Sequence, residues 1–328
     1  MMLALIENAF LSLAGSAIPA STVVVLAATG VLLNERVGVM NLGQEGLIGI
    51  GAVYSVIAVS SWSVGSPWIA MLVGMIAAAV AGLVFALCVV VFKASQVLVG
   101  LALALGGIGL SNQLGTNRNG TPIQVQFQEV NPGGKFDDND FFEAFLFHEP
   151  PVYLAYIVIP AFLWFLLFRT RHGMNMRAVG ENPAAADAVG VSVTWSRLGY
   201  TVLGAALAGA GGSYMVLSFT PTWSPDIARG RGWVALAVVI FAGWRPFRAV
   251  AGALLYGGMI SLGVTAQARG WDLPALEARD LAFFLSMLPF LVTLIAILIP
   301  AGAAKIGRRV RSTTAPAALA TPYSREDR

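Results

Sequence analysis

The most informative polar run beside an apolar stretch covers residues 34–46, Asn-Glu-Arg-Val-Gly-Val-Met-Asn-Leu-Gly-Gln-Glu-Gly. Asn41 and Glu45 are four residues apart and therefore share one face of a helix. A carboxylate inside an apolar layer is costly unless it is paired or faces water. Two interpretations follow: Asn41, Gln44 and Glu45 line a polar path, or Glu45 satisfies backbone groups at a helix break and stabilises the fold.

A second set of amide side chains belongs to one later apolar run. Gln96 opens that run, and Asn112 and Gln113 close it. Each of these residues either meets a solute or simply caps the end of a helix.

Residues suited to enzymatic chemistry are scarce. His148 and His172 lie far apart at loop edges, so neither a zinc site nor a histidine-based catalytic set is expected. Gly133-Gly134-Lys135 lacks the spacing and the Ser/Thr of a phosphate-binding loop. The apolar runs hold no paired carboxylates and no nucleophile–base pair. The sequence therefore predicts no catalytic residue, no metal, no cofactor and no nucleotide hydrolysis by the chain itself.

The composition places the chain in the membrane class. It has 328 residues, of which 57% are hydrophobic and 11% charged, with a mean hydropathy of +0.75, whereas soluble domains carry about 25% charged residues. The net charge of +3 comes from basic residues between apolar runs, where they orient a membrane protein. We therefore expect a lipid bilayer as partner and no nucleic acid. The single cysteine, Cys88, lies in an apolar run and is expected to be a packing residue.

The elements that position these residues are long apolar helices. A crossing of the bilayer takes about 20 helical residues. The sequence predicts an all-α, polytopic membrane helix bundle with about nine spans (8–10). Residues 232–244 are short for a span and are expected to form a half-span, a re-entrant element or a tilted helix buried in protein. The nine runs are Asn8–Leu33, Val37–Ser60, Val64–Phe92, Ala94–Asn117, Pro150–Phe168, Leu198–Pro225, Gly232–Trp244, Ala249–Ala268 and Leu281–Ala304.

The basic flanks of these runs predict the orientation. Lys and Arg gather in the loop 169–196 and after residue 304, which places the C-terminus in the cytoplasm and the N-terminus outside. The loop 115–149 then lies outside, with two basic and six acidic residues and a net charge of −4. We expect one transmembrane domain over residues 1–311 and a disordered cytoplasmic tail over residues 312–328, because that tail is rich in Ala, Pro, Ser and Thr.

The inner loop contains a predicted short helix from Glu181 to Gly190. Asn182 can cap it, Pro183 suits a first helical position, and three alanines favour helix. Two glycine groups are expected to let helices pack closely. They are Gly204, Ala208 and Gly212, and Gly106, Gly107 and Gly109.

Two functional classes remain after enzymes are set aside. One is a permease that depends on a separate ATPase, which would grip the helix at Glu181–Gly190. The other is an ion-coupled secondary transporter, for which Glu45 is the available intramembrane carboxylate. Broken helices repeated in two halves would favour the second class, and the sequence shows only a faint echo of such a repeat. The inner helix favours the ATP-driven permease.

Three stretches resemble the permeases of bacterial ABC importers for simple sugars and nucleosides, within the branched-chain amino acid/ribose permease superfamily. They are the run 34–46, the segment Arg177–Pro183 with Ala185, Ala186 and Gly190, and the region from Gly230 to Pro246. The likeness extends from about Ala20 to Leu298. It departs from the family at Ser95 and Ala104, where asparagine is frequent, so a different solute or a paired permease subunit that supplies the polar contacts is also consistent.

The resemblance implies a set of partners and roles. Two permease subunits, as a homodimer or heterodimer, would sit on two ATPase subunits in the bacterial cytoplasmic membrane, and an extracellular binding lipoprotein would deliver a nucleoside or simple sugar. A branched-chain amino acid or another small polar solute is the alternative cargo. The expected ATPase-coupling residues are Gly180, Glu181, Asn182, Pro183, Ala186, Asp187 and Gly190.

Overall fold

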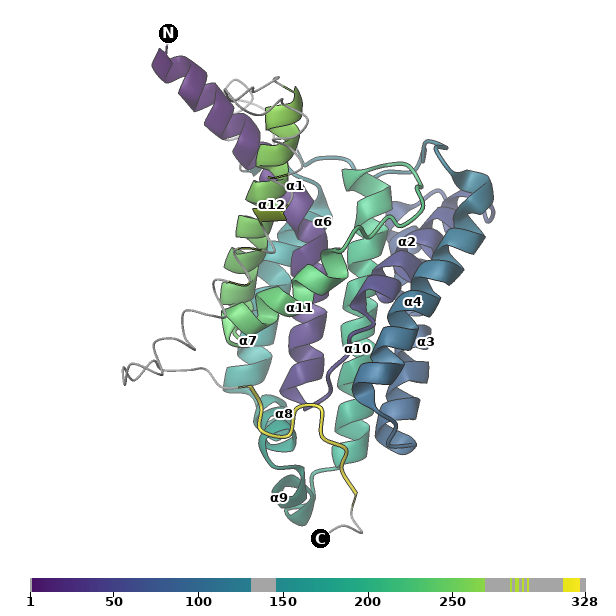
Figure 1. Ribbon diagram of the computed structural model, residues 1–328, viewed down its shortest axis with the longest axis vertical. Helices are drawn as coiled ribbons and strands as arrows, with labels where there is room; N and C mark the ends of the chain where they lie inside the picture. The colour runs from purple at the N-terminus through teal and green to yellow at the C-terminus, as the bar shows by residue number, and fades with distance from the viewer. Residues whose placement is uncertain are drawn as a thin grey trace.

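The computed structural model describes residues 2–130, 146–268 and 315–324, with five single positions between 284 and 294. These parts form a bundle of helices with two isolated β-bridges and no strand (Figure 1). The helices are α1 (Met2–Arg36), α2 (Gln44–Ser60), α3 (Pro67–Ala86), η1 (Leu87–Val91), α4 (Gln96–Gly115), η2 (Thr116–Arg118), α6 (Pro150–Tyr153), η4 (Leu154–Val158), α7 (Ile159–Arg169), α8 (Arg171–Glu181), α9 (Pro183–Ala188), α10 (Val193–Tyr214), η5 (Met215–Phe219), α11 (Arg231–Ala242) and α12 (Pro246–Ala268). The all-α expectation is confirmed for this part of the chain.

Six helical stretches within the described ranges are long and apolar enough to cross a membrane. They are Gly15–Arg36, Pro67–Val91, Gln96–Arg118, Pro150–Arg169, Val193–Phe219 and Pro246–Ala266. The expected runs at 37–60 and 232–244 form the shorter helices α2 and α11. The run Leu281–Ala304, apart from the five single positions, and loop residues 131–145 lie outside the described residues, so the count of nine spans and the orientation stay predictions.

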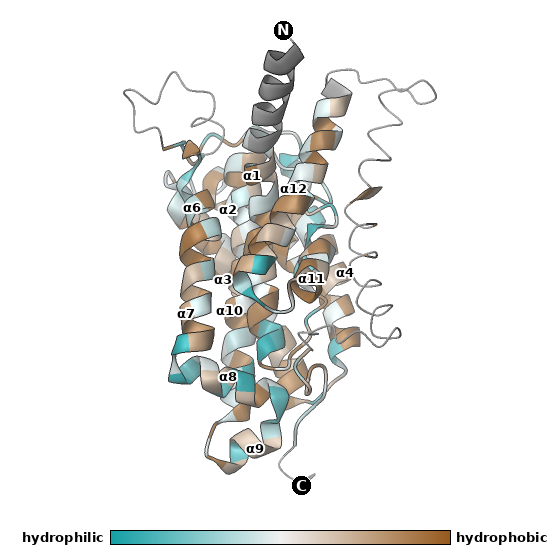
Figure 2. Ribbon diagram, turned by 90° about the vertical axis from the view of Figure 1, so that its left-hand side faces the viewer, coloured by the Kyte–Doolittle hydropathy of each residue, from teal (hydrophilic) through white to brown (hydrophobic). Residues whose placement is uncertain are grey.

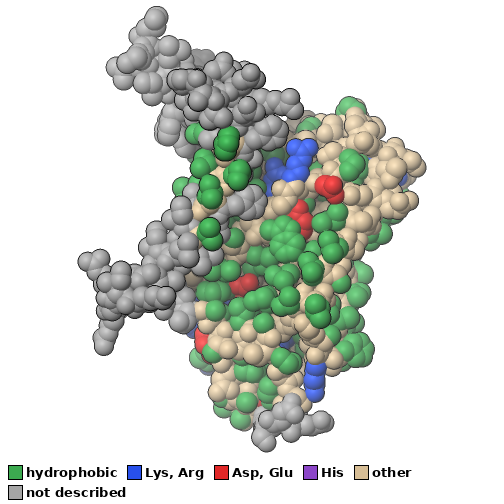
Figure 3. Space-filling view, viewed as in Figure 1, with side chains coloured by type: hydrophobic (Ala, Val, Ile, Leu, Met, Phe, Trp, Pro, Cys, Tyr) green, Lys and Arg blue, Asp and Glu red, His purple; other side chains and the backbone are tan. Residues whose placement is uncertain are grey.

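The outer surface of the bundle is apolar, as a lipid-facing surface must be. Ile76 and Val84 of α3, Leu98 of α4, Phe165 of α7 and Leu255 of α12 are all more than half exposed. Figure 2 shows brown, hydrophobic residues along α7 and α12 and teal, hydrophilic ones at α8. In Figure 3, hydrophobic side chains spread over the middle of the visible face, while basic side chains lie near its two ends.

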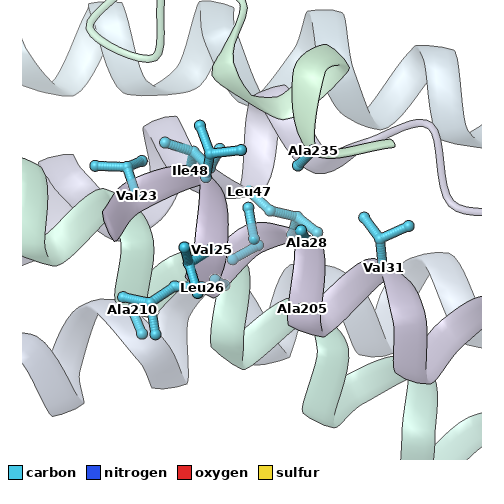
Figure 4. Close-up of a cluster of buried hydrophobic side chains, with 14 of the residues drawn as sticks. Val23, Val25, Leu26, Ala28, Val31, Leu47, Ile48, Ala205, Ala210 and Ala235 are labelled. Atoms are coloured by element: carbon cyan, nitrogen blue, oxygen red, sulfur yellow. The ribbon is translucent and has the colours of Figure 1, made fainter. Parts of the chain in front are cut away.

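The core lies where α1, α2, α10 and α11 cross (Figure 4). Small residues on α10 permit this crossing. A Cβ on Gly204 would collide with α1, one on Gly209 with α3, and one on Gly212 with the Ile48 carbonyl of α2. The packing role expected for this group is confirmed. In the other group Gly107 contacts Gly46, whereas Gly106 and Gly109 have no neighbour within 4 Å at the Cβ position.

The described helices contain two similar units that run in opposite directions. In each, a long helix leads through a non-helical stretch to a short helix and then to another long helix: α1–α2–α3 and α10–α11–α12. The pairings correspond, since α1 packs on α10, α11 and α12 while α10 packs on α1, α2 and α3. Along Figure 1, α1 descends toward α8 and α9 while α10 rises away from them. The repeat of broken-helix units, which the sequence shows only weakly, is therefore clear in the arrangement of the helices.

One end of the bundle carries α8, α9 and the C-terminal segment 315–324; we call it the α9 end (Figure 1). The tail was expected to be disordered from its composition. In the structure residues 315–324 follow a defined path along this end, and Ala318 is only 7% exposed. The cause is backbone hydrogen bonding, which any residue type can provide and which composition does not report.

Candidate functional site

The polar run 34–46 contacts both ends of the short helix α11. With 12 residues, α11 is about 18 Å long at 1.5 Å per residue, too short for a bilayer core of about 30 Å. It begins after Gly230 and ends at Gly243, both of which adopt left-handed backbone conformations that glycine tolerates. Both ends of α11 are therefore inside the bundle and need polar partners from elsewhere in the chain.

Glu45 supplies the partner at the first end. Its carboxylate accepts hydrogen bonds from the backbone N–H groups of Gly230, at 2.6 Å, and Gly232, at 2.7 Å. Glu45 also lies in the first turn of α2, so one negative charge stabilises the positive N-terminal ends of two helices. The helices touch there, because a Cβ on Gly232 would collide with the backbone of Gln44 and Glu45.

Glu35 and Arg36 hold the other end of α11. The indole Nε1 of Trp244 donates to the Glu35 carboxylate at 2.5 Å, and the Arg36 guanidinium donates to the Trp244 carbonyl at 2.7 Å. Trp244 directly follows the helix-ending Gly243. The two carboxylates of one thirteen-residue run, residues 34–46, thus anchor both ends of a helix about 200 residues further on.

Of the side-chain amides near Glu45, some atoms form hydrogen bonds and others have no hydrogen-bond partner among the described residues. The Gln96 side chain accepts from the Met40 backbone N–H at 2.7 Å, and the Asn41 Oδ1 accepts from the Gly43 N–H at 2.8 Å. Both contacts shape the turn that starts α2. Gln44 is fully buried, yet neither of its amide atoms has a hydrogen-bond partner among the described residues, and the Asn41 Nδ2 has none either.

Asn112 and Gln113 lie at the opposite end of α4, about 24 Å from Gln96 along the helix. Asn112 and Asp226 exchange two hydrogen bonds: the Asn112 Nδ2 donates to the Asp226 carboxylate at 2.8 Å and its Oδ1 accepts from the Asp226 N–H at 2.9 Å. This pair ties α4 to the stretch that leads into α11. Gln113 is exposed. The six expected solute-path residues therefore form one group of four around Glu45 and a separate pair.

Residue reasoning did not single out the groups that Glu45 binds. Gly230 and Gly232 contribute only backbone atoms, and the buried Arg231 between them stacks on the Phe219 ring at 5.6 Å. The sequence feature that could have identified them is the pattern Gly-Arg-Gly directly before an apolar run. Such a pattern indicates that the chain is interrupted, beside a charged residue, just before a helix begins.

The predicted coupling segment forms two helices at the α9 end. Asn182 separates them: its Oδ1 accepts from the Ala185 N–H at 3.0 Å, and Pro183 occupies the first turn of α9. The predicted cap and proline position are confirmed, whereas the expected single helix from Glu181 to Gly190 covers only Pro183–Ala188. The chain leaves α9 through Gly190, whose φ is +88°.

The residues of this segment point in two directions. Gly180, Ala186 and Asp187 are buried against the bundle, and a Cβ on Gly180 would collide with the Arg36 carbonyl. The outward side carries apolar residues instead, with Val189 79% exposed. Three alanines on the same side are also exposed: Ala184, Ala185 and Ala188. The remaining residues of the segment are Glu181, Asn182 and Gly190, which are exposed, and Pro183, which is half-buried.

The apolar bundle with its membrane-length helices defines a multi-pass membrane protein. A family model described as "Branched-chain amino acid transport system / permease component" matches residues 14–311, and the chain belongs to this family. A permease component of this kind is not itself the catalytic subunit.

Several curated proteins are similar over most of the chain. A Haloferax volcanii protein, TsgC13, provisionally named as a glucose ABC transporter permease, is 36% identical over 78% of this chain and 78% of its own. The nucleoside ABC transporter permease NupC of Lactococcus lactis is 30% identical over 84% and 88%. The guanosine ABC transporter permease NupQ of Bacillus subtilis is 30% identical over 91% and 92%. No solved structure gives a significant match.

Proposed function

We propose that the chain is the membrane-spanning subunit of an ATP-driven importer that moves a nucleoside or a simple sugar across the cytoplasmic membrane by alternating access. The names of the three relatives support this cargo class, two of them referring to nucleosides and one to glucose. The α9 end faces the cytoplasm and the N-terminus lies outside in this proposal, as the basic flanks indicate.

The exposed apolar side of α9 is the observation that carries the ATPase partnership. Val189 and the outward alanines lie at the tip of the bundle, and the Asn182 cap with the buried Ala186 holds α9 against it. An apolar patch on a braced element is suited to docking another protein. Two ATPase subunits would bind this side of two permease subunits, and an extracellular binding lipoprotein would meet the opposite end.

Co-purification tests the ATPase partnership. The tagged chain is purified from mild detergent, and mass spectrometry identifies what accompanies it; an ATPase subunit is expected, with a second permease if the pore is a heterodimer. Val189→Asp is expected to lower the recovered ATPase at least about tenfold, because it places a charge in an apolar contact. Val130→Asp, at an exposed valine of the opposite end, is the matched control. ATPase recovery that is equal for both variants would contradict α9 as the docking element.

The solute path passes beside Gln44 and Asn41 in this proposal, because their unused amide atoms are buried polar groups next to Glu45 that could bind a hydroxyl-rich solute. Glu45 supports the path by holding α2 and α11 together. Fixed by two backbone donors, its carboxylate is poorly placed to load and release an ion. The repeated units α1–α2–α3 and α10–α11–α12 fit an ion-coupled transporter as well, but the fixed Glu45 and the naming of the relatives as ABC transporter permeases favour the ATP-driven class.

The substitution Gln44→Met distinguishes a role of Gln44 in solute contact from a role in folding. It removes both unpartnered polar atoms at nearly constant volume, so the thermal midpoint of the purified protein should stay the same or rise. Uptake of labelled nucleoside or sugar should fall by about tenfold, the effect of roughly one lost hydrogen bond to solute. Gln113→Met, at an exposed position, should leave uptake unchanged. Normal uptake by Gln44→Met would exclude Gln44 from the path.

A further inference from the structure

The C-terminal segment 315–324 crosses the α9 end and contacts elements that are far apart in the sequence (Figure 1). Its backbone joins two of them. The Ala318 N–H donates to the Gly180 carbonyl at 2.9 Å, at the end of α8, and the Ala320 N–H donates to the Gly38 carbonyl at 3.2 Å, in the turn before α2. The segment therefore bridges the coupling helices and the run that anchors α11.

A glycine makes this close approach possible. A Cβ on Gly38 would lie 3.0 Å from the Ala318 carbonyl oxygen, whereas one on Gly180 would make only ordinary contact with Pro316, at 3.4 Å. Gly38 has a φ of +82°, and Ala320 has a φ of +62° although it is not glycine. A non-glycine residue holds such a backbone conformation only where its surroundings require it, which indicates a specific seat for the segment.

A buried arginine adds a second connection. Arg197, in the first turns of α10, is 3% exposed. Its Nε donates to the Val37 carbonyl at 3.2 Å, and its Nη1 donates to the Thr321 carbonyl at 2.9 Å. One guanidinium thus links α10, the turn before α2 and the C-terminal segment.

Side chains tie the segment to α9 and to the α3–α4 connection. The Tyr323 hydroxyl donates to the Asp187 carboxylate at 2.9 Å, on the inward side of α9. The Ala317 N–H donates to the Glu181 carboxylate at 3.2 Å, and the Lys93 ammonium donates to the Ser324 hydroxyl at 2.8 Å. A helix of six residues such as α9 is too short to be stable alone. The Asn182 cap and the buried Ala186 hold it against the bundle, and the Asp187 contact links it to the segment 315–324.

We propose that residues 315–324 form a strap that transmits the movement of α9 to the turn before α2 and to α10, and so couples ATP hydrolysis to opening of the solute path. The inference rests on the proposed function, since it assumes that an ATPase moves α9. The strap lies on the inward side of α9 through Asp187, whereas the proposed ATPase contact is on the outward side at Val189. Loss of the strap should therefore impair coupling and leave ATPase binding intact.

Cysteine accessibility tests whether the strap is seated. In a Cys88→Ser background of the full chain, Ala318→Cys should react with a maleimide at least about tenfold more slowly than Ala317→Cys. The two positions are adjacent, but Ala318 is buried and Ala317 is exposed. Equal rates would overturn the strap.

Transport per ATP tests its role. Tyr323→Phe removes one hydroxyl, and a chain that ends at residue 314 removes the whole strap. In the assembled transporter both should keep ATPase co-purification and ATP hydrolysis, while solute moved per ATP falls, by about threefold for Tyr323→Phe and by tenfold or more for the shortened chain. Tyr153→Phe removes a hydroxyl that donates to Leu146 at the opposite end and is the control.

The outcomes separate the two proposals. If the unaltered chain recovers no ATPase, the proposed function fails. If ATPase is recovered and both strap variants transport the normal amount of solute per ATP, the strap fails while the proposed function stands. Loss of ATPase recovery from the shortened chain would also overturn the transmission role, because the segment would then be part of the docking surface.

Discussion

Gly212→Leu is expected to abolish recovery of the folded permease, and Gly212→Ala to lower its stability by about 1–3 kcal/mol. The reason is the contact between α10 and α2: a Cβ at residue 212 would lie 2.8 Å from the Ile48 carbonyl carbon and 2.9 Å from the Ala52 nitrogen. Both are backbone atoms, which cannot rotate away as a side chain does. The helices must separate, and the packing of the core shown in Figure 4 is lost with them.

The same helix offers a matched control. A Cβ on Gly199 has no heavy atom within 4 Å, so Gly199→Ala should raise stability by about 0.5–1 kcal/mol through better helix propensity. The measurement is the thermal midpoint in detergent, followed by intrinsic fluorescence of the eight tryptophans. If Gly212→Ala and Gly199→Ala shift the midpoint equally, close contact between α10 and α2 is wrong.

Glu45→Ala is expected to have the second large effect, which is a decrease of about 2–6 kcal/mol in the free energy of unfolding. It leaves the buried N–H groups of Gly230 and Gly232 without their acceptor, and each unsatisfied group costs about 1–3 kcal/mol. Glu45→Gln keeps one oxygen acceptor but turns its amide N–H₂ toward the other donor. Its expected cost is therefore intermediate, about 1.5–3 kcal/mol.

The comparison of stability with uptake makes this prediction specific. The thermal midpoint and the uptake should fall together. Both should be highest in the unaltered chain, intermediate in Glu45→Gln and lowest in Glu45→Ala. Gln113→Ala, at an exposed amide, should change neither quantity. If the unaltered chain shows ion-dependent uptake, and Glu45→Gln abolishes that uptake without changing the midpoint, the anchoring role would be contradicted and the ion-coupled interpretation restored.

The sequence by itself was enough for the membrane class, for the helical runs within the described ranges and for the start of α9. These features depend on local properties. Apolar length, the low fraction of charged residues and the cap formed by Asn182 before Pro183 involve residues that are neighbours in the chain. The glycines of α10 were also readable as packing residues, because their spacing places them along one helix.

The tertiary structure decided the contacts between distant residues. The sequence identified Glu45 as important but left two roles open, because its partners lie 185 and 187 residues away and are backbone N–H groups that every residue type carries. The same reason explains the tail: its composition suggests disorder, whereas its seat depends on the carbonyls of Gly180 and Gly38 and on the buried Arg197. Which side of α9 faces inward was equally undetermined, since a six-residue alanine-rich helix has no apolar period strong enough to orient it.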